Sequence, residues 1–195
     1  MNRNWLKNYP QGVPSEIDPG QYSSLVHLLE EAFTRYRDRA AYIGFAKPMT
    51  YGELDDRSRA LGAFFQAQGI EKGDRVAIMM PNVLQYPVAL AAILRIGAVV
   101  VNVNPLYTPR ELEHQLKDSG ARAIVILENF AVTLQQVIRN TDIKQVVLAS
   151  MGDLLGFKGK IVNFVIRRVK KMVPEFSLPG AHLFNEALAT GANLT

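Results

Sequence analysis

The chain has 195 residues, of which 48% are hydrophobic and 21% charged, with a formal net charge of +4. This composition fits a soluble intracellular domain with one substantial core. The absence of cysteine excludes a disulfide framework, a thiolate metal site and a cysteine nucleophile. No apolar run resembles a signal peptide, and the longest apolar stretches, residues 86–94 and 96–101, fall short of the ~18 residues that a membrane span needs.

Residues 1–22 are rich in Asn, Pro, Gly and Gln and predict an irregular lead. Ser23 or Ser24 can cap a helix that runs to about Arg37, and a short strand is expected over residues 40–45. One face of this helix is apolar and is expected to face the core. It comprises Leu25, Leu28, Leu29, Ala32, Phe33 and Tyr36.

Thr50 and Glu53 form a predicted capping box, which opens a helix that ends at Gly69. Its apolar residues recur at helical spacing, which indicates core packing. They are Leu54, Leu61, Phe64 and Phe65.

The first turn of the same helix carries the acids Glu53, Asp55 and Asp56, a pattern that paired catalytic carboxylates can also produce. Acids in a first turn interact favourably with the helix dipole, which is the simpler interpretation. Arg57 and Arg59 follow, and we expect them to be solvated or ion-paired.

From Arg75 onward, apolar runs begin every 22 to 25 residues, near Val76, Ala98, Ala123 and Gln145. Helical patterns fill the gaps over residues 83–94, 109–118 and 130–140. This recurrence predicts an α/β fold in which a mostly parallel sheet carries helices on both faces, and an α/β subdomain over residues 23–150. Pro87 within the first of these helices is expected to cost a backbone hydrogen bond and to bend it.

The stretch 97–112, GAVVVNVNPLYTPREL, joins a strand to a helix. Residues 98–101 lack alternation, as expected for a strand covered on both faces, and Thr108, Pro109 and Glu111 read as a helix start. The loop therefore lies at the carboxyl edge of the sheet, where open α/β folds place ligands. Asn104, Tyr107 and Thr108 are the candidate binding residues, although turn formation and capping also explain them.

Residues 151–195 break the rhythm and begin with a predicted basic amphipathic helix. Six basic residues and no acid lie between Asp153 and Glu175. The rest of the chain therefore has 16 Lys and Arg and 18 Asp and Glu, so the net positive charge comes from this segment. One helical face is apolar, with Leu154, Phe157, Ile161, Phe164, Val165, Val169 and Met172, and the other carries Lys160, Asn163, Arg167, Lys170 and Lys171.

Such a helix suits the headgroup region of an anionic membrane, and a surface helix packed on its own domain is the alternative. The predicted membrane contacts are Lys160, Phe164, Arg167, Lys170 and Lys171. Nucleic-acid binding is not expected, because aromatic platforms and a wider basic surface are missing.

Two further patterns are weak. In residues 156–160, GFKGK, Leu154 and Ile161 stand where a Walker A loop needs Gly and Ser or Thr. His27, His114 and His182 have no partner at metal-ligand spacing, and each is expected to be solvated or on a helix surface.

Three motifs together resemble the amino-terminal region of the acyl-adenylate-forming enzymes: residues 49–61 (MTYGELDDRSRAL), 75–82 (RVAIMMPN) and 97–112. Within that superfamily the chain most resembles bacterial long-chain fatty-acid–CoA ligases, over residues 4–188. The resemblance implies formation of an acyl-adenylate from fatty acid and ATP with Mg²⁺, followed by transfer of the acyl group to CoA. It also puts Asn104, Tyr107 and Thr108 near the approach of the CoA nucleotide.

The Ser/Thr/Gly/Lys phosphate loop of that family does not occur in the sequence, so we expect an inactive amino-terminal scaffold fragment. The sequence assigns no catalytic residue, no metal ligand and no tightly bound cofactor to it. The expected partners are the fatty acid and an anionic membrane surface, with cytoplasmic localisation, peripheral on the inner face of the cell membrane. An exposed apolar face where the sheet lacks neighbours would favour homo-oligomers. The alternatives are a free-standing α/β membrane-docking or binding module, and an adenylating enzyme for aromatic or short acids.

Overall fold

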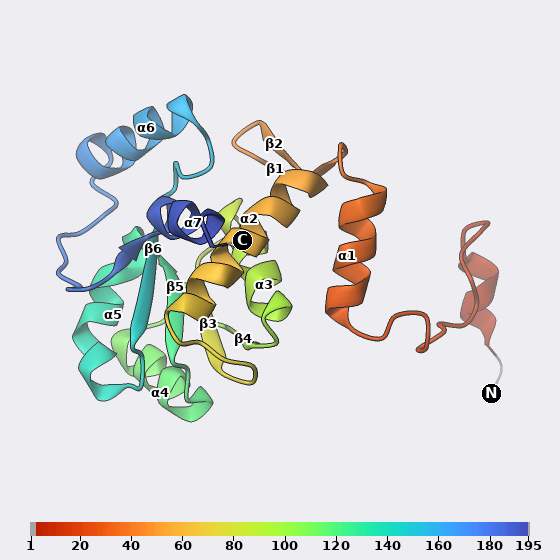
Figure 1. Ribbon diagram of the computed structural model, residues 1–195, viewed down its shortest axis with the longest axis horizontal. Coiled ribbons are helices and arrows are strands. Elements are labelled where there is room, and N and C mark those ends of the chain that lie inside the picture. Colours follow the sequence, from red (N-terminus) through yellow and green to blue (C-terminus); the bar gives the residue numbers. More distant parts are fainter. Residues whose placement is uncertain (1–2, 195) are drawn as a thin grey trace.

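The computed structural model describes residues 3–194 and has a five-stranded parallel sheet at its centre (Figure 1). The strand order is β4-β3-β5-β6-β7, and every pair of neighbours is parallel. The strands are β3 (Arg75–Met79), β4 (Val99–Asn102), β5 (Ala123–Leu127), β6 (Gln145–Ala149) and β7 (His182–Leu183).

Helices cover both faces of this sheet, as the sequence predicts. Side chains alternate along β3, so that Val76 and Ile78 join one apolar cluster while Ala77 and Met79 join the other. The first cluster packs under α2 (Tyr51–Ala67), α3 (Gln85–Arg95) and α7 (Phe184–Ala192). The second packs under α4 (Pro109–Ser119) and α5 (Ala131–Val137), which continues as η3 (Ile138–Asn140). The α/β fold class is confirmed.

The strand predicted at residues 98–101 is present as β4, and its two faces are only partly covered: Val100 packs against the first apolar cluster and Val101 against the second. β4 is an edge strand that pairs only with β3, and Val99 is 47% exposed. The apolar run reflected β propensity at a sheet edge.

The capping box predicted at Thr50 and the helix start predicted at Thr108 are both confirmed. Thr50 accepts a hydrogen bond from the backbone of Glu53 at the start of α2, and Thr108 accepts one from Glu111 at the start of α4. The hydrogen-bond loss expected at Pro87 does not occur, because α3 begins only at Gln85. Pro87 thus falls in the first turn, where its missing N–H has no intrahelical partner to lose.

The amino-terminal part contains η1 (Asn4–Asn8) and α1 (Leu25–Arg35), which Ser24 caps. Only part of the expected apolar face of α1 is buried: Phe33 is in the core, whereas Leu25 is 63% exposed. The strand expected over residues 40–45 is β1 (Ala40–Gly44), and it forms an antiparallel hairpin with β2 (Lys47–Thr50), which the sequence did not indicate.

The segment 151–175 is not one continuous helix. It consists of a turn, then α6 (Phe157–Phe164), then the π-helical η4 (Val165–Val169). Leu154 and Lys171 adopt left-handed backbone at φ 64° and 49°, which ends the helical path on both sides. Over residues 3–194, no helix combines the length and apolar character that a bilayer crossing requires.

Candidate functional site

Polar side chains gather at the carboxyl edge of the sheet. Glu128 directly follows β5, and Ser150 directly follows β6, its neighbour in the sheet. Both are buried, with 6% of each residue exposed. Because open α/β folds bind ligands at this edge, the residues around these strand ends form the candidate site.

Arg167 of η4 connects the two strand ends. Its guanidinium donates hydrogen bonds to both carboxylate oxygens of Glu128, the shortest at 2.7 Å, and another to Ser150 Oγ at 2.8 Å. We call Glu128, Ser150, Asp153 and Arg167 the edge junction. A planar guanidinium that bonds two oxygens of one carboxylate holds its partner in a fixed orientation.

Asp153 completes the edge junction from the turn that precedes α6. Its carboxylate accepts hydrogen bonds from the Ser150 backbone at 2.7 Å and from Asn185 Nδ2 at 3.1 Å, while buried Gln85 donates to the Ser150 carbonyl at 2.6 Å. Burial raises the pKa of Asp153 to about 6, against the Ser150 hydrogen bond, which lowers it. The negative charge of Glu128 raises this pKa further, and Arg167 lowers it.

The acids at the start of α2 are engaged in ion pairs. Asp55 is bound by Arg95 at 2.7 Å and by Arg59 at 2.9 Å. Arg57 lies 3.0 Å from Glu53, and Arg37 lies 3.3 Å from Asp56. Burial alone would raise the pKa of Glu53, but the Thr50 hydrogen bond and Arg57 lower it overall. This network is structural, since each carboxylate already has a cationic partner.

The loop after β4 brings Asn104, Tyr107 and Thr108 together at the same edge. Asn104 Oδ1 accepts from the Leu106 backbone at 3.0 Å, and the Tyr107 backbone donates to the Asn104 carbonyl at 3.1 Å. Thr108 exchanges hydrogen bonds with Glu111, which lower the pKa of that acid. Turn and capping contacts therefore occupy Asn104 and Thr108, the interpretation that the sequence also left open.

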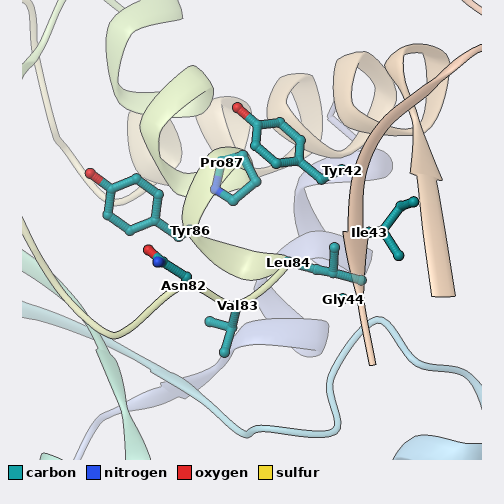
Figure 2. A pocket seen from close by; sticks show the side chains of 8 residues that line it. All are labelled: Tyr42, Ile43, Gly44, Asn82, Val83, Leu84, Tyr86 and Pro87. Carbon is teal, nitrogen blue, oxygen red and sulfur yellow. The ribbon is translucent and has the colours of Figure 1, made fainter. Parts of the chain in front are cut away.

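A hollow of ≈ 200 Å³ that sequence analysis did not anticipate lies between β1 and the start of α3 (Figure 2). Tyr42 and Tyr86 lie on either side of Pro87, and the Tyr86 hydroxyl donates to Asn102 Oδ1 at 2.8 Å. The other residues that line the hollow are Ile43, Gly44, Asn82, Val83 and Leu84. No motif pointed to this hollow, because the hairpin that forms one wall was not predicted.

The predicted membrane-contact residues lie on α6 and on the segment after it. Phe164 is 62% exposed, and Lys160, Lys170 and Lys171 are exposed as well. Arg167 is exposed too, and its guanidinium also binds buried Glu128.

The remaining candidates have structural roles. His27 and His114 lie exposed on helices, as expected, but His182 lies on β7, where its ring packs edge-on against Phe64 with ring centres 5.1 Å apart. Gly159 of the GFKGK stretch contacts the backbone of Gly152, and a Cβ at either position would overlap the other's carbonyl oxygen. These glycines permit a close backbone approach.

Comparison with known families gives one match that spans most of the chain. The family model of the AMP-binding enzymes matches residues 29–163. Among curated relatives, a long-chain-fatty-acid–CoA ligase of Salmonella typhimurium is 55% identical over 193 residues, which are 98% of this chain and 34% of the relative. A ligase of the same name from Bacillus subtilis is 31% identical over 92% of this chain and 32% of its own length. The chain thus spans about a third of the length of these relatives.

Solved structures share the fold. An anthranilate CoA ligase in complex with anthranoyl-AMP superposes with a TM-score of 0.69 at 18% identity, over 86% of this chain and 28% of that one. A long-chain-fatty-acid-CoA ligase from Archaeoglobus fulgidus superposes with a TM-score of 0.63 at 27% identity. The match covers 72% of this chain and 29% of that one.

Proposed function

The chain belongs to the AMP-binding enzyme family, and from this premise we propose that it forms the amino-terminal scaffold of an AMP-forming long-chain fatty-acid–CoA ligase. The observation that carries the proposal is the 55% identity to the Salmonella ligase over almost the whole chain. At this identity, we expect the chain to share the substrate class of its relative.

The reaction proposed for the whole protein has two steps. A fatty-acid carboxylate oxygen attacks the α-phosphorus of ATP, which forms the acyl-adenylate and expels pyrophosphate. The CoA thiol then attacks the acyl carbon, loses its proton and displaces AMP. The edge junction and the loop of Asn104, Tyr107 and Thr108 would form part of the frame around this chemistry, whose main physical requirement is orientation of the reacting groups.

The described residues do not fit Mg²⁺. Within residues 3–194, no three acidic or histidine side chains gather in a group that could hold a metal ion. The carboxylates nearest the carboxyl edge, Glu128 and Asp153, are engaged by Arg167, Ser150 and Asn185. We therefore assign no step of the reaction to a metal bound by these residues.

A chimaera tests the proposal. The chain replaces the corresponding third of the Salmonella relative, and AMP release is measured with palmitate, octanoate and benzoate in the presence of ATP and CoA. We expect activity that is highest with palmitate, and no AMP release from the isolated chain. A folded chimaera that prefers benzoate or octanoate would contradict the substrate class, and AMP release by the isolated chain would contradict the scaffold role.

We also propose that α6 and η4 dock on an anionic membrane, which would put the protein at the inner face of the cell membrane. Exposed Phe157, Ile161 and Phe164 lie on a segment with six basic residues and no acid, and this combination supports interfacial binding. Flotation with anionic vesicles tests it: Lys170→Glu with Lys171→Glu should abolish binding, whereas Lys72→Glu, far along the chain, should not. Equal flotation of both variants would contradict it.

A further inference from the structure

The tip of the β1–β2 hairpin is built from residues that turns of this kind disfavour. Gly44 pairs with Lys47, so Phe45 and Ala46 form a two-residue loop, and both have positive φ, at 51° and 59°. Two positive φ angles are typical of the type I′ turn, in which Asn and Gly are preferred because other residues are strained there. The tip therefore keeps a phenylalanine at a conformational cost.

This phenylalanine contributes little to the core. Phe45 is 59% exposed and Ile43, beside it on β1, is 73% exposed. The hairpin itself is nevertheless fixed in place. A Cβ at Gly44 would come within 2.8 Å of Leu84, so the backbone of β1 lies directly against the start of α3. The two apolar side chains are thus held outward on a rigid support.

The hairpin is also connected to the start of α6. Lys47 Nζ donates a hydrogen bond of 2.7 Å to the carbonyl of Leu154, two residues before Gly156, the N-cap of α6. Figure 1 shows the hairpin and α6 projecting on the same side of the molecule. On α6, Phe157 is 78% exposed and Ile161 is 55% exposed.

We propose that the hairpin tip, Ile43 and Phe45, and the exposed apolar side chains of α6 form one composite surface that docks on an anionic phospholipid bilayer, with Phe45 entering the acyl boundary. The proposal rests on the membrane docking proposed above and adds a second, independent insertion element to it.

Charge favours a lipid bilayer as the occupant. Residues 39–52 contain Arg39 and Lys47 and no acid, and the α6 segment contributes six more basic residues. Anionic headgroups complement such a surface, and aromatic and aliphatic side chains beside basic ones suit the headgroup boundary. A second copy of the chain would set basic residues against basic residues.

The decisive variant is Phe45→Asn, because the two roles of this side chain predict opposite effects. Asn is favoured at a positive φ, so the substitution should raise the thermal midpoint of unfolding. It also removes the inserted ring, so the partition coefficient onto vesicles of phosphatidylglycerol and phosphatidylcholine should fall about tenfold. Ala46→Gly is the matched control: it relieves strain at the neighbouring residue, keeps Phe45 and should leave partitioning unchanged.

A fluorescence measurement supplies an independent readout. Because Trp5 is the only tryptophan of the chain, Trp5→Phe with Phe45→Trp places a single fluorophore at the tip. Its emission should shift to the blue when anionic vesicles are added.

The outcomes separate the two proposals. If the wild-type chain binds vesicles but Phe45→Asn binds equally well, the hairpin role is wrong and docking by α6 stands. If the wild-type chain does not bind, both fail. Concentration-dependent dimers that Phe45→Asn abolishes would identify a second copy as the occupant and overturn the lipid proposal.

Discussion

The side chain of Arg167 reaches across 39 residues of sequence to bind both carboxylate oxygens of Glu128. The Glu128 side chain is 7% exposed, whereas that of Arg167 is 46% exposed, so the pair lies at the boundary between the core and solvent. It joins η4 to the carboxyl edge of the sheet, which means that the position of the basic segment depends on the sheet.

Arg167→Met should lower the free energy of unfolding by about 1–3 kcal/mol, because it leaves Glu128 buried without its cation. Adding Glu128→Gln should recover part of this loss, because the uncompensated charge is then absent. Urea unfolding measures both effects. Exposed Arg168→Met is the control and should change stability by less than ~0.5 kcal/mol. Equal losses in the single and double variants would show that Arg167 acts through packing alone.

Gly159→Ala should detach α6 from the turn that precedes it. The new Cβ would overlap the carbonyl oxygen of Gly152, and relief of such a clash costs about 1–3 kcal/mol. Chymotrypsin should then cut at Phe157 or Phe164 faster than in the wild type, while the sheet stays protected. Exposed Lys158→Ala, one residue away, should be cut by chymotrypsin at the wild-type rate. If Gly159→Ala is cut no faster than the wild type, the glycine contact does not hold α6.

Much of the fold could be predicted because its signals are local. A capping box needs only Thr50 and Glu53, three residues apart, and the spacing of apolar runs alone indicates the crossovers of a parallel sheet. The strand β7 could not be predicted, because it has two residues and pairs through a register set by β6.

The candidate site was less predictable, because its contacts join residues far apart in sequence. Gln85 binds the carbonyl of Ser150 across 65 residues, and no local pattern signals that contact. The hairpin tip was hidden for a different reason: Phe45 and Ala46 lack the Asn-Gly signature by which a two-residue turn is recognised. The basic segment was recognised, but the contact of its Arg167 with Glu128, 39 residues away, has no local signal either.

Thr108→Ala should lower the free energy of unfolding by about 1 kcal/mol, because α4 loses the side-chain acceptor at its N-cap. Thr108→Ser keeps the oxygen and should remain within a few tenths of wild type. In the chimaeric ligase, a raised KM for CoA with Thr108→Ser would indicate that the methyl group contacts the nucleotide. An unchanged KM together with destabilisation by Thr108→Ala alone would assign Thr108 to capping.

Asp153 should make the chain less stable as pH rises from about 4 to 6. Burial raises its pKa from 3.8 to about 6, so in this window the folded chain binds more protons than the unfolded chain. The resulting loss of unfolding free energy amounts to roughly 2–3 kcal/mol and is complete above pH 6.

Asp153→Asn removes this titration, so the variant should gain stability relative to the wild type as pH rises from 4 to 7. Urea midpoints across that range measure the difference, with exposed Asp142→Asn as the control that should follow the wild type. A difference between Asp153→Asn and the wild type that does not change with pH would show that folding leaves the pKa of Asp153 unshifted.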